Sequence, residues 1–236
     1  MLSRETLLSF CLADFQVPPS EDEVLEWFKV LKAGWVHNGN PRQCHALLHS
    51  GKHSDGFFLC KRVLKYPNLR EILAKTLALA FRSDSRGNHE KVDGVFGAPY
   101  SSITLAAEVG RFLGVPNYIV EKHYFQDIGN AMVFKSDDPI PEGARLLQVE
   151  ELITTFDSAK ATRDAIVAGN PNRVEFVPFV CTLVHRPSKM CEEYEGAKLV
   201  AIINRQVSAW DQTDCPLCKL GSVVVAPKTN WAKLTA

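Results

Sequence analysis

The sequence predicts an α/β fold in which a central, mainly parallel sheet is flanked by helices. Four apolar runs have the composition of buried strands: residues 92–97, 145–149, 174–184 and 198–203. Three segments have helical spacing or composition: residues 68–82, 102–113 and 158–168. The chain has 236 residues, 46% hydrophobic and 23% charged, which suits one globular domain of this class.

The amino-terminal segment predicts helices before the first core strand. Apolar residues between 7 and 12 have helical spacing, and Pro18-Pro19 follows them. Ser20 and Glu23 form a capping box, so we expect a helix from about residue 21 to Lys32. It should end near Gly34.

Residues 44–60 predict a strand, a turn and a second strand. Apolar and aromatic residues flank a polar centre at 50–56, which contains Lys52. This is hairpin composition with a cationic tip.

A short turn joins the strand at 92–97 to the helix at 102–113, which should end at Gly114. Its sequence is Ala98-Pro99-Tyr100-Ser101-Ser102. The turn stands at the carboxyl end of a strand, where open α/β folds bind ligands. A ligand-binding loop and a serine-rich helix cap are both compatible with these residues.

A long loop is expected at residues 122–144, after a strand at 118–121. The segment contains two glycines and two prolines. A loop of more than about 15 residues inside a compact domain is usually functional or mobile.

The stretch 143–160 reads as a buried strand, an acidic pair, a hydroxyl-rich turn and a helix start. Thr154, Thr155 and Ser158 supply hydroxyls, and the N–H groups that enter the helix favour a phosphate. Glu150 and Glu151 are acceptors suited to a vicinal diol or a hydrated magnesium ion. A phosphorylated sugar would satisfy both halves. The alternative is an acidic loop with an N-cap serine.

The net charge and the amino-terminal sequence limit which binding partners and which cellular compartment we expect. The net charge is zero, so no sequence-wide basic footprint suggests a nucleic acid or an anionic membrane. No apolar run reaches about 18 residues, and the first residues do not resemble a signal peptide, so we expect a cytoplasmic protein. Seven scattered cysteines favour reduced thiols over a disulfide framework.

Cys215 and Cys218 have the spacing of a zinc knuckle, with Gly221 behind them. A structural zinc site needs four ligands, and the sequence has one C-x-x-C. Cys44 with His45, or Cys191, could complete the set if the fold brings them close. The alternative is a turn with two free thiols.

Two motifs carry a resemblance to a known family. Residues 149–155, Val-Glu-Glu-Leu-Ile-Thr-Thr, resemble the phosphoribosyl-pyrophosphate (PRPP) motif of type I phosphoribosyltransferases. Residues 50–58 are similar to the Ser-Gly-Lys/Arg-x-Ser-x-x-Phe/Tyr-Phe signature of the orotate phosphoribosyltransferases. The resemblance implies the type I phosphoribosyltransferase fold with a small amino-terminal hood. The single domain would consist of a hood at about 20–65, a core at about 66–205 and a tail at 206–236.

The resemblance implies magnesium-dependent transfer of the phosphoribosyl group of PRPP to orotate in a homodimer. In the family the acidic pair, here Glu150 and Glu151, holds the ribose hydroxyls. The loop after it grips the 5-phosphate and corresponds here to Thr154, Thr155, Phe156, Asp157, Ser158 and Ala159. Magnesium would bridge ribose and pyrophosphate without direct side-chain ligands.

The same resemblance assigns the remaining site residues. The turn that binds pyrophosphate in the family corresponds to Tyr100, Ser101 and Ser102. Lys122 stands where a catalytic lid begins, and Arg186 where an arginine pairs with the orotate carboxylate. The hood over the base would contribute Lys52, Phe57 and Phe58.

Several departures from the family pattern leave other functions open. The acidic pair is usually Asp-Asp or Glu-Asp, and Phe156-Asp157 stands where glycine is usual. Ser101-Ser102 replaces Lys-Gly, and residues 121–129 keep one lysine of the lid pattern. A non-catalytic PRPP-binding regulatory protein and a phosphoribosyltransferase for another base are therefore the alternatives.

Overall fold

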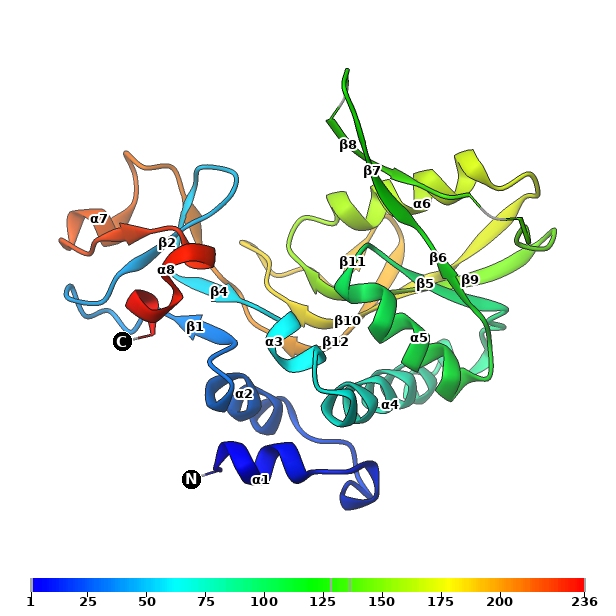
Figure 1. Cartoon of the computed structure of the whole chain (residues 1–236), viewed down its shortest axis with the longest axis horizontal. Helices are drawn as coiled ribbons and strands as arrows, with labels where there is room; N and C mark the ends of the chain where they lie inside the picture. The colour runs from blue at the N-terminus through cyan, green and yellow to red at the C-terminus, as the bar shows by residue number, and fades with distance from the viewer. Residues whose placement is uncertain (1, 128, 136, 236) are drawn as a thin grey trace.

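A six-stranded sheet lies at the centre of the computed structural model, which describes residues 2–127, 129–135 and 137–235 (Figure 1). Its strand order is β11-β12-β10-β9-β5-β6. The strands are β5 (Gly94–Gly97), β6 (Asn117–Ile119), β9 (Ala144–Ile153), β10 (Val174–His185), β11 (Glu193–Tyr194) and β12 (Ala197–Asn204). All neighbours are parallel except the edge pair β11–β12. The predicted α/β class and mainly parallel sheet are confirmed.

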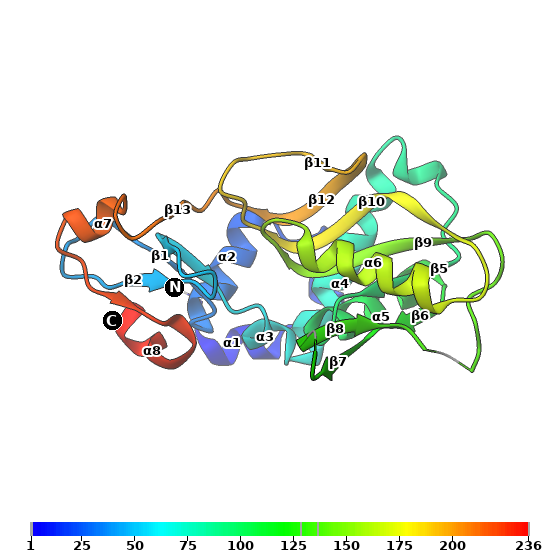
Figure 2. The same cartoon turned by 90° about the horizontal axis from the view of Figure 1, so that it is seen from above.

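Helices cover both faces of this sheet, as a parallel sheet requires. One face carries α2 (Glu21–Val30), α4 (Pro67–Ser83) and α5 (Ser101–Leu113), whose apolar residues share a cluster with Val149 and Leu183. The other face carries α6 (Asp157–Gly169), where Ile166 joins a cluster with Phe96 (Figure 2). None of the helices in the described part of the chain is both long and apolar enough to cross a membrane.

Capping signals in the sequence placed several helix ends correctly. The Ser20 hydroxyl accepts from the Glu23 N–H, and the Glu23 carboxylate accepts from the Ser20 N–H at 2.7 Å. Helix α5 ends at Gly114, whose φ of 72° is the left-handed conformation of a C-cap. Before α2 stand α1 (Arg4–Ser9) and a 3-10 turn, η1 (Leu12–Asp14), and a second turn, η2 (Gly87–His89), follows α4.

The hood is a small β lobe before α3 (Lys61–Leu64). Strand β1 (Gly34–Val36) pairs antiparallel with β4 (Gly56–Phe58), and β2 (His45–Leu47) pairs antiparallel with β3 (His53–Ser54). The predicted strand–turn–strand over residues 44–60 is confirmed.

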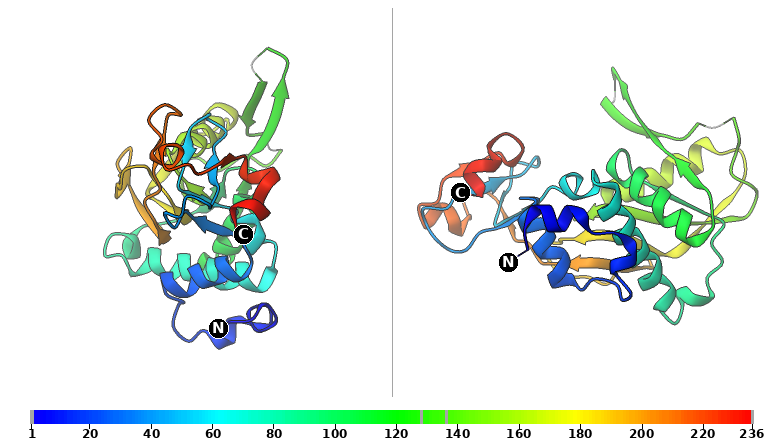
Figure 3. Two further views of the ribbon diagram at one scale, coloured as in Figure 1. Left: turned by 90° about the vertical axis from the view of Figure 1, so that its left-hand side faces the viewer. Right: turned by 60° about the horizontal axis from the view of Figure 1, so that its bottom comes forward.

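The carboxyl-terminal tail packs on the hood (Figures 1 and 3). It contains β13 (Ala209–Trp210), α7 (Pro216–Lys219), β14 (Val224–Val225) and α8 (Pro227–Leu234). Strand β13 pairs with β3 and β14 with β2, which gives a four-stranded sheet in the order β13-β3-β2-β14. Trp231 and Leu234 of α8 join an apolar cluster with Trp35 and Ala46 of the hood.

The prediction of a long loop at residues 122–144 was wrong in its first half. Strands β7 (Glu121–Phe125) and β8 (Gly129–Val133) form an antiparallel hairpin that projects from the core (Figure 1). Every residue of β7 is exposed, so the strand is held by backbone pairing and lacks the apolar alternation that marks a half-buried strand. Ile128 and Ser136, within the predicted loop, lie outside the described residues.

Candidate functional site

The acidic pair lies inside strand β9 rather than after it. The strand was expected to end at Val149, but β10 continues to pair with it, Thr182 opposite Glu150 and His185 opposite Ile153. Neighbouring residues of a strand point to opposite faces, so the two carboxylates diverge. They therefore have different surroundings.

Glu150 is buried and held by several donors. Its carboxylate accepts from the Gln148 amide at 2.7 Å, the Ser102 hydroxyl at 2.9 Å and the Ala98 N–H at 3.3 Å. Burial raises the pKa of Glu150 to about 7, although these hydrogen bonds act in the opposite direction. The carboxyl group therefore changes charge near neutral pH.

Glu151 faces the other side of β9 and is partly exposed. Burial raises its pKa, while a hydrogen bond from Ser101 and the charge of Lys61 lower it. Its Oε2 atom is buried without a hydrogen-bond partner among the described residues. A buried acceptor of this kind is suited to a ligand hydroxyl or to water on a cation.

The turn after the acidic pair enters α6 through a left-handed residue. Phe156 is the N-cap, with φ of 69°, and none of its side-chain atoms caps the helix. The interpretation with an N-cap serine is wrong, because Ser158 lies within α6. Thr155 instead donates to the Asp157 carboxylate at 2.6 Å.

A pocket of about 170 Å³ connects this turn with Glu150. It is lined by Glu150, Leu152, Ile153, Thr154, Thr155, Phe156, Asp157, Ser158 and Ala159. The structure thus gathers one acid of the pair and the predicted phosphate loop around a single hollow at the amino terminus of a helix, where backbone N–H groups and the helix dipole favour an anion.

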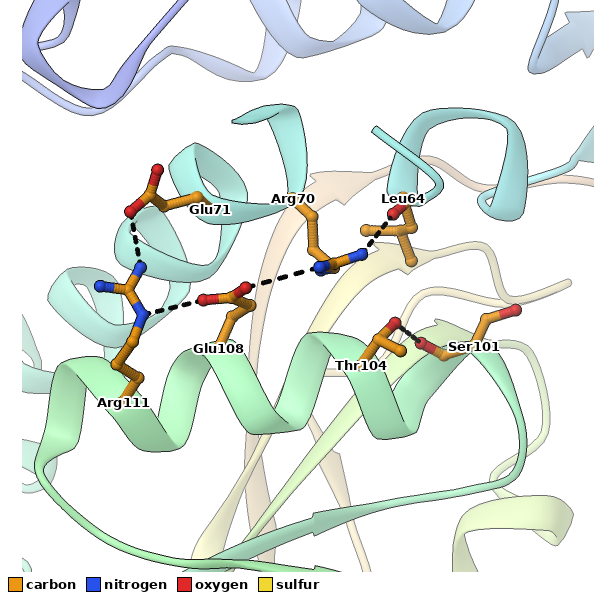
Figure 4. A network of polar contacts seen from close by, with 7 residues as sticks. All are labelled: Leu64, Arg70, Glu71, Ser101, Thr104, Glu108 and Arg111. Atoms are coloured by element: carbon orange, nitrogen blue, oxygen red, sulfur yellow. Dashed lines mark hydrogen bonds and ion pairs between the residues drawn. The ribbon is translucent and has the colours of Figure 1, made fainter. Parts of the chain in front are cut away.

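Helix α5 presents the turn at residues 98–102 beside the acidic pair. Tyr100 is 69% exposed, whereas Ser102 is buried and its oxygen also accepts from the Glu151 N–H at 2.9 Å. Two ion pairs fasten α5 to α4: Arg111 to Glu71 at 2.7 Å and Arg70 to Glu108 at 3.5 Å (Figure 4). Within α5, Arg111 also pairs with Glu108 at 2.9 Å. These contacts fix the helix whose first turn carries Ser101 and Ser102.

Arg186 connects the end of β10 with the hood. Its guanidinium donates to the Gly56 carbonyl at 3.2 Å and lies 5.4 Å from the centre of the Phe57 ring. Arg186 is 8% exposed, its Nε has no hydrogen-bond partner among the described residues, and burial lowers its pKa. No carboxylate in the described part of the chain forms an ion pair with it. A buried, incompletely paired guanidinium suits an anionic ligand group.

The other predicted residues of the hood have separate environments. Phe58 is buried and packs edge-on against Phe28, with ring centres 5.8 Å apart. Phe57 faces Trp231 of the tail at 6.1 Å. Lys52 lies at the exposed tip, 3.7 Å from Asp211 of the tail.

Lys122 lies on the exposed hairpin, away from Glu150 in the sequence but near α6. It lines a shallow hollow of about 560 Å³ together with Asn130, Asp157 and Ser158. The hairpin therefore places a cation at the edge of the predicted phosphate loop.

Sequence reasoning missed three residues that support the site. Arg163 donates to the Gln148 side chain at 2.7 Å, and Gln148 in turn holds Glu150. The Tyr194 ring stacks on Phe156 with 5.0 Å between ring centres and 7° between planes. Gln148 could have been found, because a polar residue two positions before Glu150 shares its face of the strand. Arg163 and Tyr194 had no such signal.

Comparison with known proteins identifies the family. No protein-family model matches the chain. The orotate phosphoribosyltransferase of Caldanaerobacter subterraneus subsp. tengcongensis is 30% identical over 207 residues, which cover 88% of this chain and 96% of that protein. The enzyme of the same name from Thermoanaerobacter sp. strain X514 is 31% identical with the same coverage. The chain belongs to the orotate phosphoribosyltransferase family.

A solved structure of the orotate phosphoribosyltransferase family has the same fold. The enzyme from Aeropyrum pernix aligns with a TM-score of 0.53 and 17% identity, covering 77% of this chain and 93% of that one. The predicted type I phosphoribosyltransferase fold is thereby confirmed.

Proposed function

We propose that this chain transfers the phosphoribosyl group of PRPP to orotate and releases pyrophosphate. The observation that carries the proposal is the pocket in which Glu150 and residues 154–159 meet at the amino terminus of α6. One end supplies acceptors for ribose hydroxyls and the other supplies N–H and hydroxyl donors for a phosphate. The 30% and 31% identical relatives, named orotate phosphoribosyltransferases, support the choice of reaction.

The proposed roles follow from the surroundings of each group. Glu150 and Glu151 orient the ribose, and the turn at 154–158 anchors the 5-phosphate. Ser102 holds the Glu150 carboxylate and the Glu151 backbone, so its role is to position the acidic pair. Bond cleavage passes through an oxocarbenium-like state, and catalysis comes largely from positioning and charge neutralisation.

The residues present fit a hydrated magnesium ion. Carboxylate oxygens are the acceptors such an ion prefers, and Glu151 offers a buried oxygen that lacks a partner among the described residues. When bound, magnesium would supply positive charge that neutralises the phosphates of PRPP. The side chains of the acidic pair would hold its water shell rather than ligate it directly.

The base would lie between the hood and the end of β10. Arg186 is proposed to pair with the orotate carboxylate, because its guanidinium is buried and incompletely paired. Phe57 and Phe58 would contribute backbone contacts, and Lys52 would close the tip of the hood. Tyr100 and Ser101 would face pyrophosphate, with Lys122 supplying a cation from the hairpin.

The assembly and compartment are part of the same proposal. A homodimer is expected, in which the projecting hairpin reaches the neighbouring subunit's site. Light scattering should give about twice the 26.3 kDa chain mass, and a monomer at micromolar concentration would contradict it. We also propose a cytoplasmic location, and one domain made of hood, core and tail.

Ligand-dependent stabilisation tests the binding half of the proposal. PRPP with magnesium should stabilise the folded chain by about 2.7 kcal/mol at a hundredfold excess over Kd. Replacing Glu150 and Glu151 with alanine should remove most of this shift, whereas Glu192→Ala, an exposed acid elsewhere, should keep it. If millimolar PRPP does not change the stability of the wild type, the proposal is wrong.

A product assay tests the transfer step and the choice of base. The replacement of the lid and pyrophosphate-loop cations favours two other candidates, a non-catalytic PRPP-binding regulator and an enzyme for another base. Orotate, uracil and purines should be compared in parallel, and orotate should give slow but measurable nucleotide. Product from a purine alone would support a changed base, and PRPP binding without product would support the regulator.

A further inference from the structure

Two histidines and two cysteines meet in the hood, at its junction with the tail. One nitrogen or sulfur atom from each of His45, His53, Cys215 and Cys218 lies within 4.8 Å of every other. We propose that these four side chains bind a zinc ion that fastens the tail to the hood. The sequence pointed to the two cysteines and offered His45 among the possible partners, but it did not indicate His53. Cys44 is not part of the cluster, and Cys191 Sγ instead lies 3.8 Å from His185 Nε2.

The separations fit tetrahedral coordination. With Zn–S near 2.3 Å and Zn–N near 2.0–2.1 Å, ligand atoms lie roughly 3.3–3.8 Å apart. Nε2 of His45 lies 3.7 Å from Cys215 Sγ and 3.5 Å from Cys218 Sγ. Nδ1 of His53 lies 3.2 Å from Cys218 Sγ and 3.0 Å from His45 Nε2. The two shorter separations need to open by only a few tenths of an ångström.

Hydrogen bonds outside the cluster give His45 the right tautomer. The Ser222 hydroxyl donates its one proton to the Gln43 carbonyl at 2.5 Å. Its oxygen, 2.9 Å from Nδ1 of His45, must therefore accept a proton from that nitrogen. Nε2 is then left with a free lone pair directed at the cluster. A second partner that fixes the ring in this way is usual for metal-bound histidines.

The topology brings the ligands together from distant parts of the chain. His45 and His53 lie on the adjacent strands β2 and β3, and β14 and β13 of the tail flank these strands. Cys215 is the N-cap of α7 and Cys218 lies within this short helix. Just after the helix, the Gly221 N–H donates to the Cys218 carbonyl at 3.0 Å. Gly221 has φ of 92°, a conformation that glycine adopts without strain.

The ligand set selects the class of metal. Two thiolates and two imidazoles suit zinc, whereas magnesium and calcium prefer oxygen ligands. Four protein ligands would fill the tetrahedral positions, which makes this a closed site of the structural type. His45 and Cys215 are fully buried, His53 is 3% exposed and Cys218 is half-buried.

The site supports the part of the hood that faces the proposed base. Next to His53, the Ser54 hydroxyl donates to the Ser208 carbonyl at 2.8 Å, and the Ser208 N–H donates to Asp55 at 2.8 Å. The following residue, Gly56, supplies the carbonyl that binds Arg186. Zinc would hold this segment in place, which is a structural and not a catalytic role.

Metal analysis of the full-length chain tests the proposal directly. The wild type should retain one zinc per chain after dialysis and lose it to a strong chelator, and Co²⁺ should then give the visible and thiolate charge-transfer absorption of a tetrahedral site. Cys215→Ser and Cys218→Ser should retain at least tenfold less zinc. Cys44→Ser, beside His45 in the sequence, is the matched control and should retain it. Ser222→Ala should weaken binding by about 10–100-fold.

Two outcomes would overturn the zinc site. One is a wild-type chain that retains no zinc and gives no thiolate–cobalt absorption, which would make the cluster a hydrogen-bonded group of neutral side chains. The other is equal zinc retention by wild type and Cys215→Ser. The cobalt spectrum of the wild type decides the matter even if the cysteine variants fail to fold.

A kinetic measurement tests whether the zinc site supports the hood segment that faces the base. This test rests on the proposed function. Chelation should raise the KM for orotate at least severalfold more than the KM for PRPP, and zinc should restore it. Equal effects on both KM values would overturn the supporting role while leaving zinc binding intact. Zinc retention without any turnover would contradict the proposed function alone.

Discussion

The Ser102 hydroxyl donates to the Glu150 carboxylate at 2.9 Å, which fastens the first turn of α5 to the acidic pair on β9. The same oxygen accepts from the backbone N–H of Glu151 at 2.9 Å. One buried side chain thus links the two strand–helix turns of the site. Because the first contact is buried and the second partly buried, their loss should affect stability as well as binding.

Ser102→Ala should lower the free energy of unfolding by about 1–3 kcal/mol, because it leaves a buried N–H and a carboxylate short of partners. Urea denaturation would measure the change. Thr104→Ala on the same helix removes an exposed hydroxyl that donates to the Ser101 carbonyl, and should cost less than about 0.5 kcal/mol. Equal losses in the two variants would show that the Ser102 contacts contribute little.

The Glu150 carboxyl should make stability depend on pH. Its pKa is raised from 4.5 to about 7, so the folded chain keeps a proton that the unfolded chain releases. This stabilisation is full below about pH 4.5 and is lost as pH rises through about 7. Glu150→Gln lacks this titratable group. Its free energy of unfolding, taken relative to that of the wild type, should therefore rise by roughly 3 kcal/mol between pH 4 and pH 8.

Thermal and urea unfolding of both proteins across this pH range would measure the difference. Burial raises the pKa of Glu150, with a smaller contribution from the Glu151 charge, while hydrogen bonds from Gln148, Ser102 and the Ala98 N–H lower it. Glu192→Gln, which changes an exposed acid, should stay parallel to the wild type. A constant difference between Glu150→Gln and the wild type would mean that folding does not raise the pKa of Glu150.

At position 156 a glycine variant should be more stable than an alanine variant, which reverses the usual order in helices. Its φ of 69° costs a residue with a Cβ roughly 1–2 kcal/mol, which glycine does not pay. Both Phe156→Gly and Phe156→Ala lose the stacking on Tyr194, so both should be less stable than the wild type. Phe156→Gly should nevertheless be about 1 kcal/mol more stable than Phe156→Ala by urea denaturation.

Ala159→Gly, in the first turn of α6, provides the control for this comparison. At an ordinary helical position glycine should be less stable than alanine by about 1 kcal/mol. A Phe156→Gly variant less stable than Phe156→Ala would show that the left-handed N-cap is not retained in solution.

Arg186→Lys should weaken the binding of the base much more than the binding of the sugar phosphate. A lysine keeps the charge but loses the planar pair of donors, so the KM for orotate should rise at least tenfold. The KM for PRPP should change less than about twofold. Arg205→Lys changes an exposed arginine paired with Glu21 at 3.0 Å and should leave both values unchanged. An unchanged KM for orotate would remove Arg186 from the base site.

Lys122→Ala should slow turnover without unfolding the chain. Loss of one cation aimed at developing charge typically costs about 2.7–4 kcal/mol of barrier, or on the order of a hundredfold in kcat. Lys122 is exposed, so the free energy of unfolding should change by less than about 0.5 kcal/mol. Lys228→Ala on α8 is the control, and an unchanged kcat in Lys122→Ala would exclude this role.

The core strands of the sheet, the crossover helices and the position of the acidic motif could all be predicted from the sequence. These features are local: buried strands are apolar runs, and helix ends carry capping residues such as Ser20 and Gly114. The motif at 149–155 also identified the phosphate loop, because hydroxyls, acids and a helix start are adjacent in the chain.

Which side chains face one another could not be predicted in this way, because it depends on how distant segments pack. The separate surroundings of Glu150 and Glu151 depend on how far β10 pairs along β9, and this pairing joins residues some thirty positions apart. His45 and His53 reach Cys215 and Cys218 only because tail strands dock on both sides of the hood hairpin. Contacts between distant segments depend on packing and backbone pairing rather than on local residue preference, so no local pattern encodes them.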